Sequence, residues 1–231
     1  MPPDSPLRSA FTAGLLEVAP ILLGVVPFGL IAGVTAVEIG IDALPAFAWS
    51  PLVFAGASQL AAIDLLGRDA AVAVIIATPL VINARFVMYS ASLAPYLRRI
   101  PPLHKLAVAY LLTDQAYGVS IARITSREEP VGVRTAHYFG AGLGLWFTWQ
   151  ISSLVGVLVG VGVPAEWSLD FAIPLVFVAL LFPAIRDRAS VTAALAGAGV
   201  AVAAAGLPLN LGLLVGVTVG IGSGYWMASV E

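Results

Sequence analysis

The chain has 231 residues, of which 60% are hydrophobic and only 10% are charged. The mean hydropathy of +0.99 excludes an ordinary soluble domain and indicates an integral membrane protein. The formal net charge of -2 and the absence of cysteine exclude a basic nucleic-acid-binding surface, disulfides, thiolate metal sites and cysteine nucleophiles.

Uncharged apolar runs recur along the chain, and a membrane-spanning helix needs about 20 such residues. They predict an all-α, polytopic helical bundle with about 7–8 hydrophobic segments, some of them broken or re-entrant. In chain order the segments are 10–37, 43–63, 70–94, 106–122, 138–163, 169–185 and an uncharged run over 189–230, which has room for two spans joined at Gly206-Leu207-Pro208. We expect one transmembrane transporter domain over residues 1–231, with residues 1–9 as a short cytoplasmic tail and no signal peptide.

The first two segments contain small residues beside helix-breaking or polar ones. Pro27 lies in GVVPFG, residues 24–29, and predicts a kink or break in the first helix. The second segment contains FAGASQ, residues 54–59, with Gly56, Ser58 and Gln59 in mid-span. A half-helix that starts there would offer free backbone N–H groups to a carboxylate. Close helix packing explains the same small residues equally well.

The third segment carries an arginine deep inside an apolar stretch. Arg85 lies about 22 Å along the helix from Ala70, at about 1.5 Å per residue, which is too deep for a residue at the bilayer edge. On a helical wheel Thr78, Tyr89 and Ser92 share the face of Arg85, whereas Asn83 lies on the opposite side. A polar, proline-interrupted span favours a ligand pathway. The alternative is a structural arginine paired with a neighbouring carboxylate.

Four ionisable residues, Glu17, Asp64, Arg85 and Asp114, fall within or near the apolar segments. Each costs about 2.5–3.5 kcal/mol on insertion scales, so pairing Arg85 with Asp114 or Asp64 would offset much of that cost. In a transporter the arginine would bind a carboxylate, and an acidic residue would accept a proton or the substrate ammonium. Asp114, Asp64 and Glu17 are therefore the candidate coupling residues. Asp64, beside a turn, and Glu17, near a span end, could instead be interfacial.

The distribution of basic residues conflicts with a chain in which every segment crosses. With the N-terminus inside, every basic connection is cytoplasmic, as expected for lysine and arginine, except the loop that contains Arg98, Arg99 and Lys105. Either the rule fails once, or neighbouring segments do not cross fully. The segments around Pro79 and Asp114 are the natural candidates for broken or re-entrant helices.

The last segment has a stripe of small residues at every fourth position, Gly212, Gly216, Gly220 and Gly224. Such a stripe lets another helix approach closely. The partner could be a helix of the same chain or a second subunit, and the sequence favours the former.

Enzyme signatures are absent from the sequence, which contains no GxSxG, HExxH, P-loop or GxGxxG motif in a suitable context. The two histidines, His104 and His137, flank charged connections and do not suggest a metal site. An aspartyl dyad of Asp64 and Asp114 is conceivable but weakly supported. We therefore expect no enzyme activity, no cofactor and no metal, and expect uphill transport to draw on an ion gradient, on the substrate's own gradient or on another chain.

Four sequence blocks in the first half resemble the AzlC-type branched-chain amino acid permeases (azaleucine resistance). These blocks are GLLEVAPILLGVVPFGLIAG, SPLVFAGASQLAA, NARFVMYSASLAPYL and LLTDQAYGVS, and the resemblance covers residues 9–125. It implies export of branched-chain amino acids across the bacterial inner membrane by a multi-pass protein that works with a small AzlD-type membrane subunit. Gln115 replaces an acidic residue that is frequent in the family, which shifts the expected coupling role to Asp114.

The sequence therefore predicts an exporter of small apolar amino acids that works by alternating access in a heteromeric complex. Asn83, Arg85 and Tyr89 are expected to line the pathway, with contacts from Gly56, Ser58, Gln59 and the break at Pro27. A non-transporting scaffold or assembly subunit and a channel are the alternatives.

Overall fold

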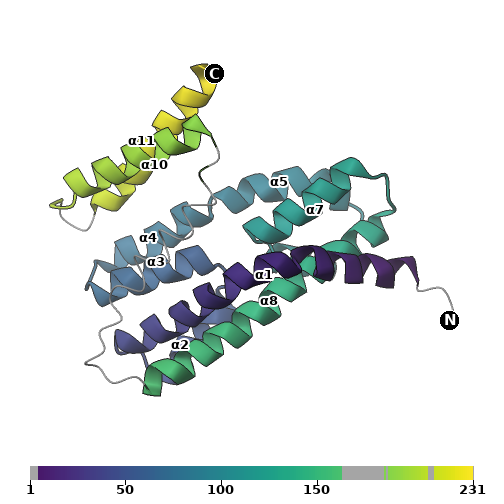
Figure 1. Ribbon diagram of the computed structural model, residues 1–231, viewed down its shortest axis with the longest axis horizontal. Helices are drawn as coiled ribbons and strands as arrows, with labels where there is room; N and C mark the ends of the chain where they lie inside the picture. The colour runs from purple at the N-terminus through teal and green to yellow at the C-terminus, as the bar shows by residue number, and fades with distance from the viewer. Residues whose placement is uncertain (1–4, 163–184, 186, 208–210, 231) are drawn as a thin grey trace. The chain divides into compact units, whose positions relative to one another are not determined.

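The computed structural model describes residues 5–162, 185, 187–207 and 211–230, and the regular elements in these ranges are α-helices (Figure 1). In chain order they are α1 (Pro6–Glu38), α2 (Ala43–Leu52), α3 (Gly56–Gly67), α4 (Val72–Asn83), α5 (Arg85–Leu97), α6 (Pro102–Tyr110), α7 (Asp114–Ser126), α8 (Val131–Gly162), α10 (Arg188–Ala203) and α11 (Leu211–Val230). The predicted all-α class is confirmed for these ranges.

Four stretches of the described chain are long and apolar enough to cross a membrane: Pro6–Glu38, Val72–Leu97, Val131–Gly162 and Leu211–Val230. They support a helical membrane protein. The predicted count of 7–8 segments is not reached by this criterion, and the predicted segment 169–185 lies outside the described residues apart from Ile185.

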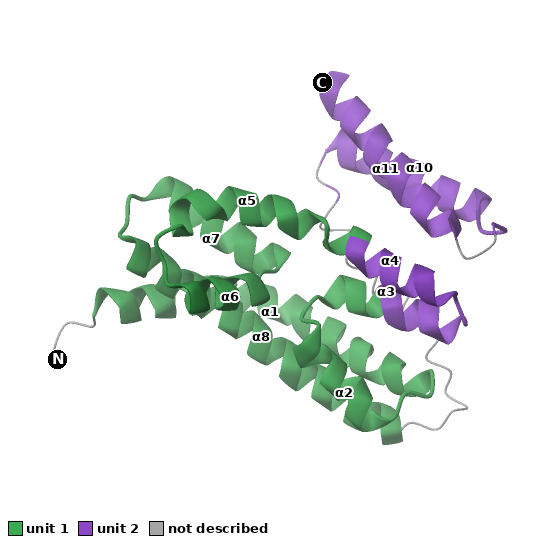
Figure 2. Cartoon of the chain, turned by 180° about the vertical axis from the view of Figure 1, so that it is seen from behind, with its two compact units in different colours: residues 1–60, 81–167 green, residues 61–80, 168–231 purple. Residues whose placement is uncertain are grey.

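The chain divides into two compact units, residues 1–60 with 81–167 and residues 61–80 with 168–231 (Figure 2). Each unit is described by itself below. The prediction of a single transporter domain over 1–231 stays a prediction.

In the first unit, α1 and α8 pack against each other with their backbones in contact. We call this helix pair the frame of the unit. At Gly140 a Cβ atom would overlap the carbonyl oxygen of Phe11, and at Gly156 it would overlap that of Leu30. Only glycine allows two helix backbones to approach this closely. The contacts advance along both helices in the same direction, so α1 and α8 are parallel, as Figure 1 shows. If both helices span the bilayer, they cross it in the same direction.

Both frame helices are longer than a bilayer is thick. With 33 and 32 residues each is about 50 Å long, against a hydrocarbon core of about 30 Å. Glu17 of α1 contacts His137 of α8 at 2.9 Å, and uncharged apolar stretches follow on both helices, 18–37 and 138–162. The two side chains therefore lie at one membrane boundary. We call this end of the first unit, with the N-termini of α1 and α8, the near end.

Helix α6 starts and helix α7 ends at the near end, and the two helices meet further along α8, away from that end. Near the start of α6, the rings of His104 and Phe139 are 6.0 Å apart. At the end of α6, Trp146 donates from Nε1 to the Tyr110 hydroxyl at 2.8 Å. Trp146 is nine residues beyond His137 (146 minus 137), about 14 Å deeper along α8. Near the end of α7, Arg123 forms an ion pair with Glu17 at the near end, with 3.4 Å between Nη1 and Oε1. Helix α6 therefore starts, and helix α7 ends, at the near end of the α1–α8 pair.

The segment around Asp114 was predicted either to cross or to be broken or re-entrant, and an interruption at residues 111–113 divides it into α6 and α7. The α5–α6 connection, with its basic residues, lies at the near end together with the α7–α8 connection. The Arg134 guanidinium lies over the Tyr96 ring, 5.7 Å from its centroid. Tyr96 is about one helical turn before Arg99.

The helix breaks differ from those expected from proline. Helix α1 continues through Pro27, whose side chain is exposed, so the predicted break there is wrong. Helix α4 continues through Pro79, and the interruption comes at Ala84 instead. Isolated prolines lose one helical hydrogen bond each, and surrounding residues of a membrane helix can compensate for that loss.

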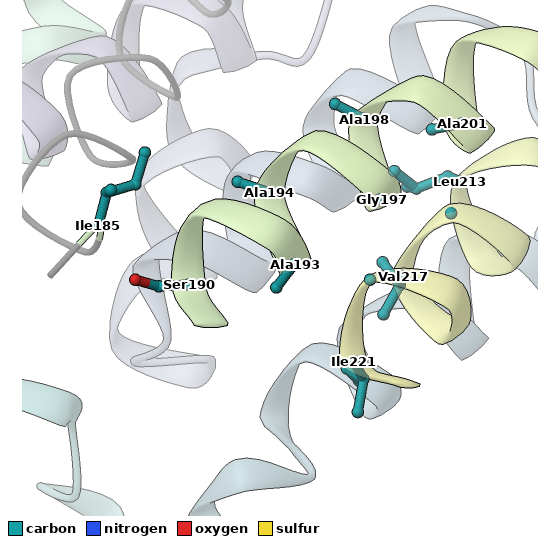
Figure 3. Close-up of a pocket in the computed structure, with 12 residues that line it drawn as sticks. Ile185, Ser190, Ala193, Ala194, Gly197, Ala198, Ala201, Leu213, Val217 and Ile221 are labelled. Carbon is teal, nitrogen blue, oxygen red and sulfur yellow. The ribbon is translucent and has the colours of Figure 1, made fainter. Parts of the chain in front are cut away.

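The second unit contains an antiparallel pair of helices, α10 and α11. A Cβ atom at Gly216 would lie 2.7 Å from the Gly197 oxygen, and one at Gly212 would lie 2.5 Å from the Ala204 oxygen. The glycine stripe of α11 therefore faces α10 of the same chain. An apolar groove of ≈ 450 Å³ lies along this seam. Ala193 and Val217 are among its lining residues, which Figure 3 draws as sticks.

Candidate substrate site at three helix breaks

Three interruptions of helical structure come together in the first unit. They are residues 53–55 between α2 and α3, Ala84 between α4 and α5, and residues 111–113 between α6 and α7. Side chains beside the breaks join them: Tyr110 donates to the Pro51 carbonyl at 2.6 Å, and Asn83 donates from Nδ2 to Ser58 Oγ at 3.0 Å. Broken helices place polar backbone and side-chain groups within the depth of the membrane.

The predicted ion pair of Arg85 and Asp114 is present. Arg85 Nη2 lies 2.9 Å from Asp114 Oδ2, and Tyr89 donates its hydroxyl to Asp114 Oδ1 at 2.8 Å. About one third of each side chain of the ion pair is exposed, 35% for Arg85 and 38% for Asp114. The pair is therefore neutral as a whole and accessible to a small ligand.

Local sequence explains why Asp114 lies at this break. Thr113 caps α7 by accepting a hydrogen bond from the Ala116 amide at 3.2 Å, as threonine commonly does at helix starts. Asp114 is then in the first turn, where the helix dipole favours a negative charge.

Two tyrosines fix the distance between α5 and α7. The rings of Tyr89 and Tyr117 are stacked, with 4.3 Å between their centroids. Tyr117 also donates to Ser92 Oγ at 3.1 Å. The face predicted from the helical wheel, with Tyr89 and Ser92 on the side of Arg85, is confirmed by these contacts.

A second polar group lies on the other side of the Ala84 break. Asn83 bonds Ser58, which in turn donates to the Ala55 carbonyl at 2.9 Å. Gln59 donates to Ser50 Oγ at 3.0 Å. Ser58 and Gln59 are both buried, and a Cβ atom at Gly56 would lie 2.6 Å from the Trp149 ring, so glycine is needed there for packing.

Two buried polar atoms beside Ala84 have no hydrogen-bond partner within the described residues. They are the amide oxygen of Asn83, an acceptor, and Nε of Arg85, a donor. Buried polar groups in proteins are nearly always satisfied, so this donor and this acceptor, one on each side of Ala84, are candidate contacts for a ligand. A carboxylate could bind Arg85, and an ammonium group could bind Asn83 and Asp114.

Apolar side chains surround the breaks. Phe54, Ala55, Leu111 and Leu112 are buried, and Phe28 of α1 makes an edge contact with Trp149 of α8, with centroids 5.3 Å apart. A ligand with a charged head group and a small apolar remainder would match such surroundings.

The other predicted site residues lie elsewhere. Glu17 is at the near end, with His137 and Arg123. Asp64 pairs locally with Arg68 of the same helix at 2.9 Å, as acidic and basic residues four apart commonly do. Pro27 is exposed on α1. Tyr110, which lies four residues before Asp114 and so on the same helical face, was not among the predicted site residues. Neither was His137, which was noted only as flanking a charged connection.

The near-end cluster also includes a residue of the α7–α8 connection. Arg123 binds Glu129 through both Nε and Nη2, at 3.0 and 2.8 Å. This side-chain hydrogen bond lowers the pKa of the Glu129 carboxyl, since it stabilises the ionised form.

Comparison with known proteins gives matches along most of the chain. The family model described as AzlC protein matches residues 20–163, which include all three helix breaks. The chain is 25% identical over 204 residues to the inner membrane protein YgaZ of Escherichia coli, covering 85% of this chain and 82% of that protein. It is 31% identical over 192 residues to an uncharacterized membrane protein of Archaeoglobus fulgidus, covering 81% of each. An uncharacterized membrane protein of Helicobacter pylori strain 26695 is 30% identical over 155 residues, covering 65% of this chain and 64% of that protein. No solved structure matches the chain.

Proposed function

The chain belongs to the AzlC protein family, and on that premise we propose that it is a transporter subunit that exports small apolar, branched-chain amino acids. It acts in the bacterial inner membrane as a multi-pass protein, with a small AzlD-type membrane subunit as its partner and without enzymatic chemistry. The near end, with the basic connections of the first unit, faces the cytoplasm, in agreement with the preference of arginine and lysine for that side.

One observation supports the substrate class above all others: the unpartnered donor of Arg85 and acceptor of Asn83 beside the Ala84 break. An α-amino acid carries its anionic and its cationic group on the same carbon atom. Its carboxylate would bind the Arg85 guanidinium, and its ammonium would bind the Asn83 amide oxygen and Asp114. The apolar side chain would remain among Phe54, Ala55 and the neighbouring residues.

The charge balance of the site also suits a zwitterion. Arg85 and Asp114 neutralise each other in the free site. A zwitterion that inserts between them leaves each charge paired, so no net charge enters the membrane at any stage. A proton on Asp114 would instead free Arg85 for the substrate carboxylate, which gives Asp114 a role in coupling export to an ion gradient.

The first experiment is efflux of labelled leucine, isoleucine and valine from cells that express this chain with and without a candidate small subunit. Arg85→Ala is expected to abolish efflux while the protein still inserts. Arg99→Ala, which removes an exposed arginine of the near-end loop, is the matched control and should retain it. Normal efflux by Arg85→Ala would refute the proposed site.

The same assay separates the alternatives. A scaffold would tolerate Asn83→Ala and Tyr89→Ala but not loss of the glycine stripe of α11. A channel would give flux that does not saturate with substrate concentration.

A further inference from the structure

The α5–α6 connection and the first turn of α6 carry positive charges that no nearby acidic residue balances. Between Asp69 and Asp114 the sequence has no acidic residue, whereas Arg98, Arg99 and Lys105 lie in this stretch. All three are exposed. None of them forms an ion pair within the part of the chain that the structure describes. Their charges are therefore available to an anion from outside the chain.

Helix α8 adds a fourth cation beside this connection. The Arg134 guanidinium lies 5.7 Å from the centroid of the Tyr96 ring, and such stacking holds the plane of a guanidinium in place. Its Nε is buried and has no hydrogen-bond partner among the described residues. Buried donors are nearly always satisfied, so an acceptor from outside these residues belongs next to Arg134. Phosphate suits a guanidinium, which binds it through two parallel hydrogen bonds.

Contacts at both ends of the α5–α6 connection place it along the first turns of α8. Tyr96 lies at Arg134, and the His104 ring lies 6.0 Å from the Phe139 ring. Those two α8 residues are five apart (139 minus 134), about 7.5 Å along the helix. His137, which marks the membrane boundary, lies between them. The four cations therefore lie at the level of the lipid headgroups.

The acidic residues of the near end already have basic neighbours. Arg123 forms ion pairs with both Glu17 and Glu129. Glu128, which is exposed on the α7–α8 connection, follows the exposed Arg127 directly in the sequence. The near end of the first unit therefore keeps an excess of positive charge. We call four of its residues the basic site: Arg98, Arg99, Lys105 and Arg134.

Exposed apolar side chains lie next to these charges. Leu103 and Leu106, the neighbours of Lys105 on either side in α6, are 75% and 68% exposed. A phospholipid would offer a phosphate to the cations and an acyl chain to these two leucines, whereas a soluble anion would leave the leucines uncovered. A zwitterionic headgroup brings its own cation, which the basic site would repel.

We propose that the basic site binds the headgroup of an anionic phospholipid, with an acyl chain against Leu103 and Leu106. Clusters of lysine and arginine at a membrane boundary attract anionic headgroups in this way. The inference is independent of the proposed export, because the basic site lies at the near end and the three helix breaks lie deeper along α8.

The test is lipid binding to the purified chain in detergent, measured by native mass spectrometry with phosphatidylglycerol and phosphatidylcholine of equal acyl chains. We expect phosphatidylglycerol to bind more tightly by at least about tenfold, since each cation near an anionic surface contributes about fivefold. The variant Arg98→Gln/Arg99→Gln/Lys105→Gln should lose this preference, because it removes three exposed charges. Leu103→Ser/Leu106→Ser should weaken the binding of both lipids.

Two control variants separate a site from net charge. Arg98→Lys/Arg99→Lys keeps both charges and should keep the preference for phosphatidylglycerol. Arg68→Gln/Arg188→Gln removes two exposed arginines of the second unit and should keep it as well. Equal affinity of the parent chain for the two lipids, or a preference that persists in the triple variant, would overturn the proposal. A preference that Arg68→Gln/Arg188→Gln abolishes would overturn it too, since net charge alone would then explain the binding.

Discussion

The backbone contact between α1 and α8 makes Gly33→Ala a direct test of the frame. A Cβ atom there would overlap the carbonyl oxygen of Ser153 and would lie 2.6 Å from the amide nitrogen of Val157. These are backbone atoms, which cannot rotate away as a side chain can. The added methyl group must therefore push the two helices apart.

The structure sets the size of this effect. An ordinary van der Waals contact begins at 3.4 Å, so the contact with Val157 alone is 0.8 Å too short (3.4 minus 2.6). Overpacking of this kind costs about 1–3 kcal/mol. Alanine also favours the helix over glycine by about 1 kcal/mol. Gly24→Ala in the same helix gains that propensity alone, because nothing lies within 4 Å of its Cβ position.

The assay is thermal unfolding of the purified variants in detergent, followed by circular dichroism at equal scan rates. Relative to Gly24→Ala, Gly33→Ala should be less stable by about 1–3 kcal/mol, which corresponds to a Tm lower by roughly 2–12 °C for a chain of this size. Equal Tm values for the two variants would refute the parallel, backbone-close packing of α1 and α8.

Two further predictions concern the break region and the near end. Tyr110→Phe removes the hydroxyl that binds Trp146 Nε1 and the Pro51 carbonyl and should cost about 1–3 kcal/mol in unfolding experiments. Tyr225→Phe, at a residue 79% exposed, is the control, and equal stability of the two variants would contradict the role of Tyr110. Because Arg123 lowers the pKa of Glu129 in the folded state, this carboxyl should add stability above its unfolded pKa of about 4.3, and the contribution should be lost as pH falls through the lower folded value. Glu129→Gln should remove that part of the dependence of Tm on pH, and an unchanged profile would argue against the interaction.

The sequence was informative about composition and about the environment of one charged residue. Hydropathy alone identified a helical membrane protein, since no soluble fold can bury so much apolar surface. The helical wheel around Arg85 predicted the face that carries Tyr89 and Ser92, because a regular helix fixes angles between neighbouring residues. The requirement that a charge in the membrane be paired predicted the contact with Asp114. The transport role of these residues stays a proposal.

The remaining features depend on tertiary contacts that local sequence does not encode. Hydropathy does not distinguish a helix that crosses the membrane from one that turns back, so the sequence left open whether residues 106–122 cross. Pro27 and Pro79 suggested helix breaks, but α1 and α4 continue through these residues. His137 was read as part of a charged connection, although it is buried because α1 lies against α8, where a Cβ at Gly14 would overlap the His137 carbonyl oxygen.

The pairing of α1 with α8 has a consequence for the synthesis of the protein. Leu30 and Gly156, which meet in the frame, are separated by 126 residues (156 minus 30). At a translation rate of about 5–20 residues per second, α1 waits roughly 6–25 s for its partner to leave the ribosome. During that interval its glycine face is open to lipid and to other nascent helices. Folding of the first unit therefore ends with the arrival of α8, and a chain released before that point would lack the helix that closes its own core.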